Sequence, residues 1–253
     1  MAVLEQQKTG GKSEAAELVK TVLYAVGIAL VLRIFLFQPF NIPTGSMIPN
    51  LQIGDYLFVS KYAYGYSKHS FPFSLGPFEG RILGSEPERG DVIVFKLPSD
   101  GRTDYIKRLI GLPGDRIQMI DGRLFINGEP VRKERIDDEI YRDSNGSTHR
   151  IARYRETLPN GVSYVVREVH GDRGANDDTR PFVVPEGHYF MMGDNRDNSA
   201  DSRTPHVGFV PYENLVGRAE RIFFSADGAK ARLWEVWKWP FAIRYGRILH
   251  AVE

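Results

Sequence analysis

One serine and one lysine are the residues of this sequence that could do chemistry together. Ser46 lies in FNIPTGSMIPNL, residues 40–51, where prolines on both sides restrict the backbone. Lys107 lies in DYIKRLIGLPGD, residues 104–115. A serine hydroxyl becomes an effective nucleophile when a neighbouring base takes its proton. The first question is therefore which side chain could act as that base.

Histidine, the usual base for a serine, is poorly placed in this chain. None of the six histidines stands in a local pattern with a carboxylate that suggests a Ser-His-Asp triad. The G-x-S-x-G pattern is also absent around Ser46. Taken alone, a serine in a loop is more often a capping or turn residue. Catalysis at Ser46 therefore depends on a base other than histidine.

Lys107 could be that base if its side chain is buried. With the two-residue period of a strand, Tyr105, Lys107 and Leu109 share one face, so the lysine has apolar neighbours. Burial disfavours the ammonium ion, and a lysine base at neutral pH needs its pKa lowered from about 10.4 to about 7–8. The alternative interpretation is an ordinary strand with a solvated Lys-Arg pair.

A charged stretch, MMGDNRDNSADSR at residues 191–203, follows an apolar run and also has two interpretations. A calcium loop is one, because a D-x-[DN] pattern appears at Asp197 in a crude form, with Ser199 at its third position; the closing glutamate and the central glycine spacing are missing. The other is that its paired charges and a hydroxyl orient a lysine amine.

The elements that would position these residues are mainly strands. Runs rich in β-branched and aromatic residues, with Asp121-Gly122 and Asn127-Gly128 as tight-turn dipeptides, predict a meander. A short turn opened by Pro211 is the best helical candidate in this part of the chain. The predicted strands lie in residues 55–65, 90–98, 103–111, 116–131 and 218–225. The fold class is therefore mainly β.

Two stretches look like additions to the strands, residues 62–90 and residues 131–180. The first is dense in Gly, Pro, Ser and aromatic residues, and the second is dense in charge. Within the second, Pro159-Asn160-Gly161 stands between two strand-like runs and predicts a hairpin. We interpret residues 131–180 as a polar cap subdomain inserted between core strands.

The C-terminal segment, residues 225–253, mixes aromatic and basic residues. Such a mixture favours a membrane interface, and the alternative is a tail packed on the core. Its large aromatic residues are Trp234, Trp237, Trp239 and Phe241.

An apolar run at residues 18–38 predicts a transmembrane anchor, since residues 18–37 would span about 30 Å as a helix. A cleaved signal peptide and a buried core helix are the alternatives. The first is disfavoured because no A-x-A-like cleavage site follows the run. Arg33 would extend its side chain toward the interface. Lysines precede the run, and no Lys or Arg occurs between Arg33 and Lys61, so residues 1–17 are predicted to be a cytoplasmic tail.

Composition excludes several other functions. The chain has 253 residues, 42% of them apolar, and its 33 basic against 32 acidic residues give a net charge of +1. This balance does not suggest a nucleic-acid partner. The absence of cysteine excludes disulfides, thiol catalysis and cysteine-based zinc sites. We expect no cofactor and no metal.

Taken together and in order, these stretches resemble the bacterial type I signal peptidases. PTGSMIPNL resembles the nucleophile box of that family, and RGDVIVFK and YIKRLIGLPGD resemble its next two boxes. GDNRDNSADSR resembles its last box, and all four of these sequence boxes follow a predicted N-terminal membrane segment. The resemblance covers residues 18–130 and 181–224. It implies an antiparallel catalytic β core at residues 39–130 and 181–224, with residues 131–180 as the inserted cap.

The resemblance also implies a Ser-Lys dyad. Ser46 would be the nucleophile, and Lys107 the general base that takes its proton and later delivers it to the leaving amine. The oxyanion hole would use the Ser46 backbone N–H and the hydroxyl of Thr44, where many relatives have serine. The threonine keeps the donor and adds a methyl group.

Four further residues would support the dyad. Ser199 would hydrogen-bond the amine of the lysine base and orient it. Asp201 and Arg203 would form an ion pair that shapes the loop, and Asp194 would belong to the same supporting group.

The implied function is removal of signal peptides from exported preproteins at the outer face of the bacterial cytoplasmic membrane. The implied partners are signal-peptide-bearing preproteins and the lipid bilayer, and cleavage would follow small residues at positions −1 and −3. Residues 91–96 and the stretch after Ser46 are the candidates for the pocket walls. Two alternatives remain: a related self-cleaving or specialised Ser-Lys peptidase, and a membrane-anchored β-domain that only binds a partner.

Overall fold

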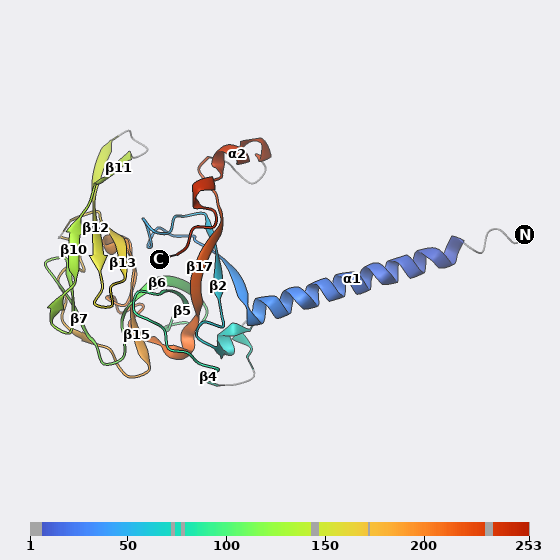
Figure 1. Cartoon of the computed structure of the whole chain (residues 1–253), viewed down its shortest axis with the longest axis horizontal. Coiled ribbons are helices and arrows are strands. Elements are labelled where there is room, and N and C mark those ends of the chain that lie inside the picture. Colours follow the sequence, from blue (N-terminus) through green and yellow to red (C-terminus); the bar gives the residue numbers. More distant parts are fainter. Residues whose placement is uncertain are drawn as a thin grey trace, which may run out of the picture.

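The computed structural model describes residues 7–71, 74–76, 79–142, 147–171, 173–230 and 235–252. These residues form one long N-terminal helix and a body made mainly of antiparallel strands (Figure 1), as the sequence predicts. The helices are α1 (Gln7–Phe35) and α2 (Trp239–Ala242). The strands before the charge-rich stretch are β1 (Phe37–Asn41), β2 (Asp55–Ser60), β3 (Tyr66–Ser67), β4 (Arg81–Ile82), β5 (Val92–Lys96), β6 (Asp104–Gly111), β7 (Arg116–Ile120), β8 (Arg123–Ile126) and β9 (Glu129–Pro130). The later strands are β10 (Arg132–Arg135), β11 (Glu139–Arg142), β12 (Thr148–Thr157), β13 (Ser163–Glu168), β14 (Phe182–Val183), β15 (His188–Met192), β16 (Val210–Pro211) and β17 (Leu215–Ser225).

Helix α1 projects away from the β body (Figure 1). Its segment Glu14–Phe35 is long and apolar enough to cross a membrane, and none of its apolar window is buried. The buried core helix is therefore the wrong alternative. The helix ends before Pro39, because proline disfavours helical backbone in the residue before it. The last two residues of the predicted anchor, Phe37 and Gln38, consequently belong to β1.

A seven-stranded antiparallel sheet, in the order β1-β2-β17-β5-β6-β15-β16, forms the centre of the body. Register shifts occur where β17 pairs with β2 and β5, and where β15 pairs with β6. Such bulges increase the local twist and bend a strand. The bent sheet brings β6 and the loop after β15 toward the segment that follows β1.

Two predicted tight turns are confirmed. Asp121-Gly122 joins β7 to β8 with φ values of 47° and 67°, and Asn127-Gly128 joins β8 to β9 with φ values of 55° and 89°. Positive φ at both central residues is the requirement of the hairpin turn that these dipeptides favour. The short turn after Pro211 is confirmed as a single 3₁₀ turn, Tyr212–Asn214.

The charge-rich stretch forms a separate four-stranded sheet, in which β12 pairs with β10, β11 and β13. The hairpin predicted at Pro159-Asn160-Gly161 is confirmed, because Thr157 pairs with Ser163 on either side of it. This sheet lies on the side of the body away from α1 (Figure 1). The division of the chain into domains stays a prediction.

Strand β6 runs where three apolar clusters meet. Ile106 packs in the first cluster with Leu57 and Val94, and Ile110 packs in the second with Phe190. Leu109 belongs to the third cluster. The strand is therefore buried on both faces from Ile106 onward, and any charged side chain on it must leave water.

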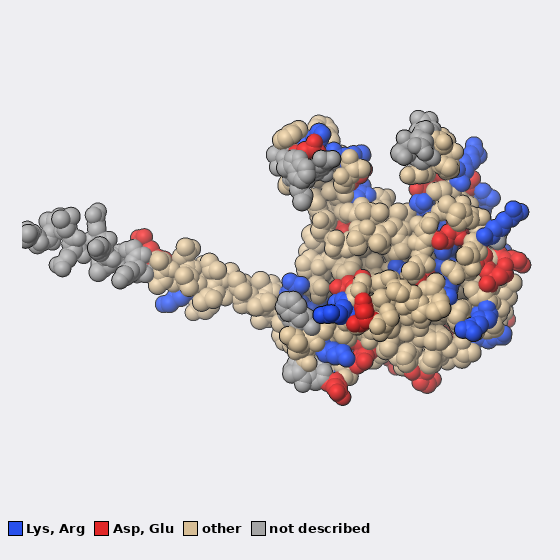
Figure 2. Space-filling view, turned by 180° about the vertical axis from the view of Figure 1, so that it is seen from behind, with Lys and Arg blue, Asp and Glu red and all other residues tan. Residues whose placement is uncertain are grey.

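The C-terminal segment returns to the central sheet. Isolated bridges pair Ala226 with Ile243 and Arg221 with Ala251. The aromatic side chains remain outside: Trp237 is 66% exposed, Trp239 43% and Phe241 80%. With α2, this segment forms one of two projections that rise from the body in Figure 2. Trp234 lies outside the described residues.

Candidate active site

Ser46 and Lys107 meet in the structure although they are 61 positions apart. The Lys107 Nζ donates a hydrogen bond of 2.7 Å to the Ser46 Oγ and one of 2.8 Å to the Ile106 carbonyl. Both side chains are buried, with 7% of Ser46 and 3% of Lys107 exposed. Strand β6 supplies the lysine, and the segment between β1 and β2 supplies the serine.

Burial changes the acid-base behaviour of Lys107. Loss of water lowers the pKa of its amine from 10.5 to about 8, and the carboxylates of Asp201 and Asp194 oppose this shift. The apolar surroundings follow from its place on β6, with the Tyr105 ring centre 5.3 Å from the Nζ. A substantial fraction of the amine is consequently neutral near pH 8. A neutral amine beside a hydroxyl can accept the proton of that hydroxyl.

The carboxylate of Asp194 is held by the arginine next to the lysine. Arg108 donates from its Nε and its Nη2 to the two oxygens of Asp194, both at 2.9 Å, and neither side chain reaches solvent. The guanidinium of Arg108 also lies 4.1 Å from the centre of the Tyr164 ring. The interpretation of residues 107 and 108 as a solvated Lys-Arg pair is therefore wrong.

Asp201 and Arg203 form the ion pair that the sequence predicts between them. The Arg203 Nε and Nη2 donate to Asp201 at 2.9 and 2.8 Å, and the pair is fully enclosed. The guanidinium helps to hold the pKa of Asp201 below its usual value against the opposing effect of burial. The Gly193 N–H donates to the same carboxylate at 3.0 Å. The pair thus fixes the loop next to the dyad.

Ser199 does not make the predicted hydrogen bond to Lys107. Its Oγ is buried and has no hydrogen-bond partner among the described residues, although it lies near Asp201 and helps to lower the pKa of that carboxyl. It also packs against Gly193, where a Cβ would lie 2.2 Å from the Ser199 Oγ and 2.6 Å from the Ser46 carbonyl oxygen. Only glycine therefore fits at position 193. Ser199 lies next to the dyad, and its predicted role in orienting the Lys107 amine stays a prediction.

Asn195 attaches the charged loop to the nucleophile segment. Its backbone N–H donates to the Ser46 carbonyl at 3.0 Å, and its Nδ2 donates to the Gly45 carbonyl at 2.9 Å. Asn195 itself is buried. Sequence reasoning missed this residue, because an asparagine in a polar loop gives no sign of a partner 150 positions away.

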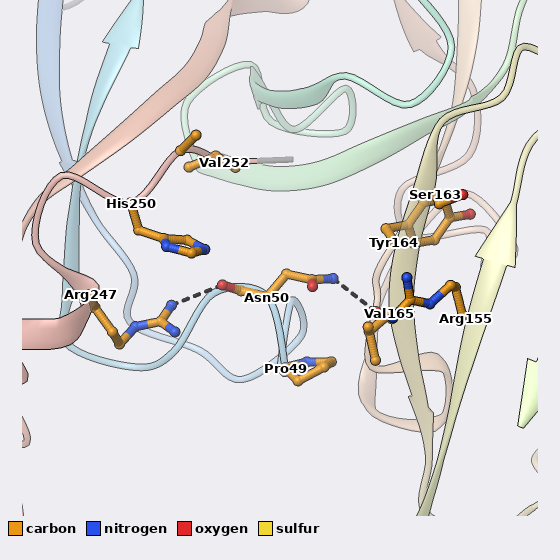
Figure 3. A pocket seen from close by; sticks show the side chains of 10 residues that line it. Pro49, Asn50, Arg155, Ser163, Tyr164, Val165, Arg247, His250 and Val252 are labelled. Atoms are coloured by element: carbon orange, nitrogen blue, oxygen red, sulfur yellow. Dashed lines mark hydrogen bonds between the residues drawn. The ribbon is translucent and has the colours of Figure 1, made fainter. Parts of the chain in front are cut away.

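Asn50 is a second residue that sequence reasoning missed. It lies at the centre of Figure 3, between the C-terminal segment and β13. Its Nδ2 donates to the Val165 carbonyl at 2.8 Å, while its backbone carbonyl accepts from Arg247 at 2.8 Å (Figure 3). The same Nδ2 also donates to Asp194 at 2.7 Å. Asn50 thereby connects the segment that carries Ser46 to three distant parts of the chain.

The charge-rich sheet also reaches this loop. Arg196 donates to both oxygens of Glu156 on β12, and each side chain is 1% exposed. The Nε of Arg196 donates to the Gly193 carbonyl at 3.3 Å. An ion pair between residues 40 positions apart therefore holds the loop against the stretch that the sequence predicts as a cap.

A cavity of about 510 Å³ opens beside the dyad and is lined by Ser46, Lys107 and Thr44. Thr44 is exposed and shares this cavity with Ser46. The remaining lining comes from Phe40, Pro43, Gly45, Thr103, Asp104, Tyr105, Ile106, Asn195, Asn198 and Ala200.

The wall candidates in residues 91–96 and directly after Ser46 do not line this cavity, and their place in the substrate pockets stays a prediction. Strand β5 buries its residues Val92–Phe95 in the core, and β6 and the residues before Ser46 form the walls instead.

Comparisons with known proteins all identify one protein family, and the matches cover most of the chain. The family model described as signal peptidase, peptidase S26, matches residues 15–224. A signal peptidase I from Rickettsia canadensis, strain McKiel, is 45% identical over 227 residues, which are 86% of this chain and 83% of that protein. The signal peptidase I of Rickettsia typhi, strain Wilmington, is 46% identical over 211 residues, covering 80% and 77%.

A solved signal peptidase I from Enterococcus faecalis V583 is 31% identical and aligns with a TM-score of 0.31 over 53% of this chain and 97% of that chain. The family match covers the nucleophile segment, β6 and the charged loop alike. The resemblance stated from the sequence is thereby confirmed. On the family model and the two Rickettsia relatives, this chain belongs to the signal peptidase family, peptidase S26, and is a serine peptidase of the signal peptidase I type.

Proposed function

We propose that this chain removes signal peptides by a Ser46/Lys107 dyad. The observation that supports the proposal is the 2.7 Å contact between the Ser46 Oγ and the Lys107 Nζ inside a buried site. A buried amine with a pKa of about 8 can act as a base where a solvated lysine cannot. Histidine is not needed for this chemistry.

The reaction would proceed in two halves. The neutral amine of Lys107 takes the proton of Ser46 while the Oγ attacks the scissile carbonyl, and the ammonium then gives that proton to the leaving amine. A water molecule, activated by the same amine, hydrolyses the acyl-enzyme and releases Ser46. The developing oxyanion would be stabilised by the Ser46 N–H and the Thr44 hydroxyl, which border the same cavity.

We expect small substrate side chains next to the cleaved bond. Phe40, Tyr105, Ile106 and Ala200 give it apolar walls close to Ser46. Shallow apolar pockets accept alanine-sized groups at positions −1 and −3, whereas a charged group there would lose its hydration without a partner. The cleavage preference that the family implies is consistent with this lining.

Helix α1 is proposed as a permanent membrane anchor. Residues 1–17 would lie in the cytoplasm and the β body outside the cytoplasmic membrane of a bacterium, because lysines precede the apolar segment. The exposed side chains of Trp237, Trp239 and Phe241 suit contact with the bilayer interface. An enzyme and a preprotein anchored in one membrane meet at high effective concentration.

Cleavage of a purified preprotein tests the chemical part of this proposal. We expect Ser46→Ala and Lys107→Ala each to abolish cleavage, and Lys107→Arg to fail as well because its guanidinium stays protonated. The matched controls are Ser99→Ala and Lys230→Ala, both exposed on the surface, which should cleave like the unaltered enzyme. Substantial turnover by Lys107→Arg would overturn the dyad.

Protease added to intact spheroplasts tests the orientation. We expect residues beyond 60 to be accessible and a tag at residue 5 to be protected. An accessible tag at residue 5 would reverse the orientation, and a mature protein that lacks residues 1–45 would establish the cleaved signal instead.

A further inference from the structure

A second cavity, of about 540 Å³, lies where α1 meets the β body. It is built apart from the dyad: neither Ser46 nor Lys107 lines it. Its walls are apolar at Leu30, Phe71 and Val216, and its other side chains are polar or charged. The cations that line it are Arg33, Lys61, Lys96 and Arg102.

These four cations exceed the negative charge available to them. The one carboxylate in the described lining is Asp104, which pairs with Lys96 at 2.8 Å. The guanidinium groups of Arg33 and Arg102 make no hydrogen bond or ion pair with any described residue. His69 also lines the cavity, and burial lowers its pKa to about 4, so it is neutral and adds no further positive charge. The cavity therefore has an unbalanced positive charge.

Lys61 is the most unusual member of this set. Its side chain is enclosed, with 2% of the residue exposed, and its Nζ donates to the Ser70 carbonyl at 2.5 Å. Burial first, and then the positive charges of Arg33 and Lys96, lower the pKa of its amine to about 8, while Asp104 opposes this shift. A buried ammonium without its own carboxylate is costly unless an anion joins it.

The position of the cavity indicates which anion it receives. The end of α1 is fixed to the body by the Tyr66 hydroxyl, which donates to the Phe35 carbonyl at 2.8 Å, and by the Lys61 N–H, which donates to the Leu36 carbonyl at 3.0 Å. If α1 spans the membrane, this end lies at the level of the lipid headgroups. Lys and Arg side chains lie at that junction in Figure 2, with Asp or Glu side chains beside them.

We propose that this cavity binds the phosphate of an anionic phospholipid, with Arg33, Lys61 and Arg102 as its ligands and Leu30 and Val216 beside the glycerol and first acyl carbons. The inference rests on the proposed membrane anchoring of α1. Basic pockets beside membrane helices are suited to acidic headgroups, and guanidinium groups match phosphate geometry. Asp104 also lines the cavity of the dyad, so the lipid would lie next to the substrate groove.

Binding of short-chain phosphatidylglycerol to the full chain in nonionic micelles, measured by calorimetry, tests this site. Phosphatidylcholine and inorganic phosphate are the comparison ligands. We expect one phosphatidylglycerol per chain, bound at least tenfold more tightly than either. Equal affinity for the two lipids would overturn the proposal, and so would inorganic phosphate binding as tightly as phosphatidylglycerol, because the site would then take a free anion.

The test variant is the double substitution Arg33→Gln with Arg102→Gln, which leaves the buried Lys61 in place. We expect its affinity for phosphatidylglycerol to fall by roughly tenfold to thirtyfold, since each cation near an anionic surface contributes about fivefold. The matched control is Arg116→Gln with Arg123→Gln, exposed on β7 and β8, which should bind within about twofold of the unaltered chain. Equal losses in both double variants would mean only non-specific charge attraction and would overturn the site.

Cleavage of a preprotein by the same preparations separates this inference from the proposed function. A chain that cleaves but shows no preference for phosphatidylglycerol would contradict the lipid site and leave the proposed function intact. A chain that binds phosphatidylglycerol through Arg33 and Arg102 but cleaves nothing would support the lipid site and contradict the proposed peptidase chemistry.

Discussion

Arg108 and Asp194 form a fully enclosed ion pair with two parallel hydrogen bonds of 2.9 Å. Arg108 is the neighbour of Lys107 on β6, and Asp194 opens the loop that contains Asp201. The pair therefore fixes the strand of the proposed base against the loop that surrounds it. Its geometry explains how a lysine on one strand can be held within hydrogen-bonding distance of a serine on another segment.

Arg108→Met should lower the free energy of unfolding by about 3–5 kcal/mol, because it leaves the Asp194 carboxylate buried without its cation. Chemical unfolding of the full chain in micelles measures this. Arg135→Met is the matched control, since the Arg135 side chain is 62% exposed and loss of its pair with Asp138 should change stability by less than about 1 kcal/mol. Equal effects of the two substitutions would contradict the role assigned to Arg108.

Asn50→Ala should destabilise the fold by about 1–3 kcal/mol, because it removes the hydrogen bonds to Asp194 and to the Val165 carbonyl. Asn50→Asp should destabilise it more, since a second carboxylate would then face Asp194. Thermal unfolding in micelles ranks the two variants. An aspartate variant as stable as the unaltered chain would show that Asn50 is not the donor.

Thr44→Val should reduce turnover by about 10²–10³, or roughly 3–4 kcal/mol, with little change in KM, if the hydroxyl stabilises the oxyanion. The substitution keeps the β-branched shape and removes only the donor. Thr44→Ser keeps the donor, so it should retain most of the activity. Steady-state cleavage of a preprotein gives both values. If the valine variant is active and the serine variant impaired, Thr44 is a packing residue.

Lys107→Met should make the chain more stable at pH 7 while it abolishes cleavage. The folded pKa of Lys107 is about 8 and its usual value 10.5, so below pH 8 the folded state carries the whole penalty of burying the ammonium, about 3 kcal/mol. Between pH 8 and 10.5 the penalty shrinks as pH rises, so the difference in stability between the methionine variant and the unaltered chain should disappear. Unfolding measured at pH 7 and pH 10 checks this. A methionine variant less stable than the unaltered chain at pH 7 would argue against a destabilising amine.

Local patterns in the sequence predicted much of the fold. The Asp121-Gly122 and Asn127-Gly128 turns follow from residues that accept positive φ, and the hairpin around Asn160 follows from its flanking runs. The two-residue period also placed Tyr105 and Lys107 on one face, and both line the cavity of the dyad. Such features depend on neighbouring residues only.

Long-range partners could not be read in the same way. Asn195 reaches Gly45 across 150 positions, and Arg196 reaches Glu156 across 40. The charge-rich stretch was predicted to be polar, yet Glu156 and Glu168 are buried because each has a cation opposite it. A charge becomes compatible with a protein interior only through such a partner. No period or turn signal in the sequence identifies that partner.

The pH dependence of kcat/KM for preprotein cleavage tests the central claim most directly, because it reports the ionisation of the free enzyme. The neutral amine of Lys107 is the active form and its pKa is about 8, so kcat/KM should be low below pH 7, rise with pH and have its midpoint near pH 8. A midpoint near pH 10, the range of a solvated lysine, would contradict a buried amine as the base of Ser46.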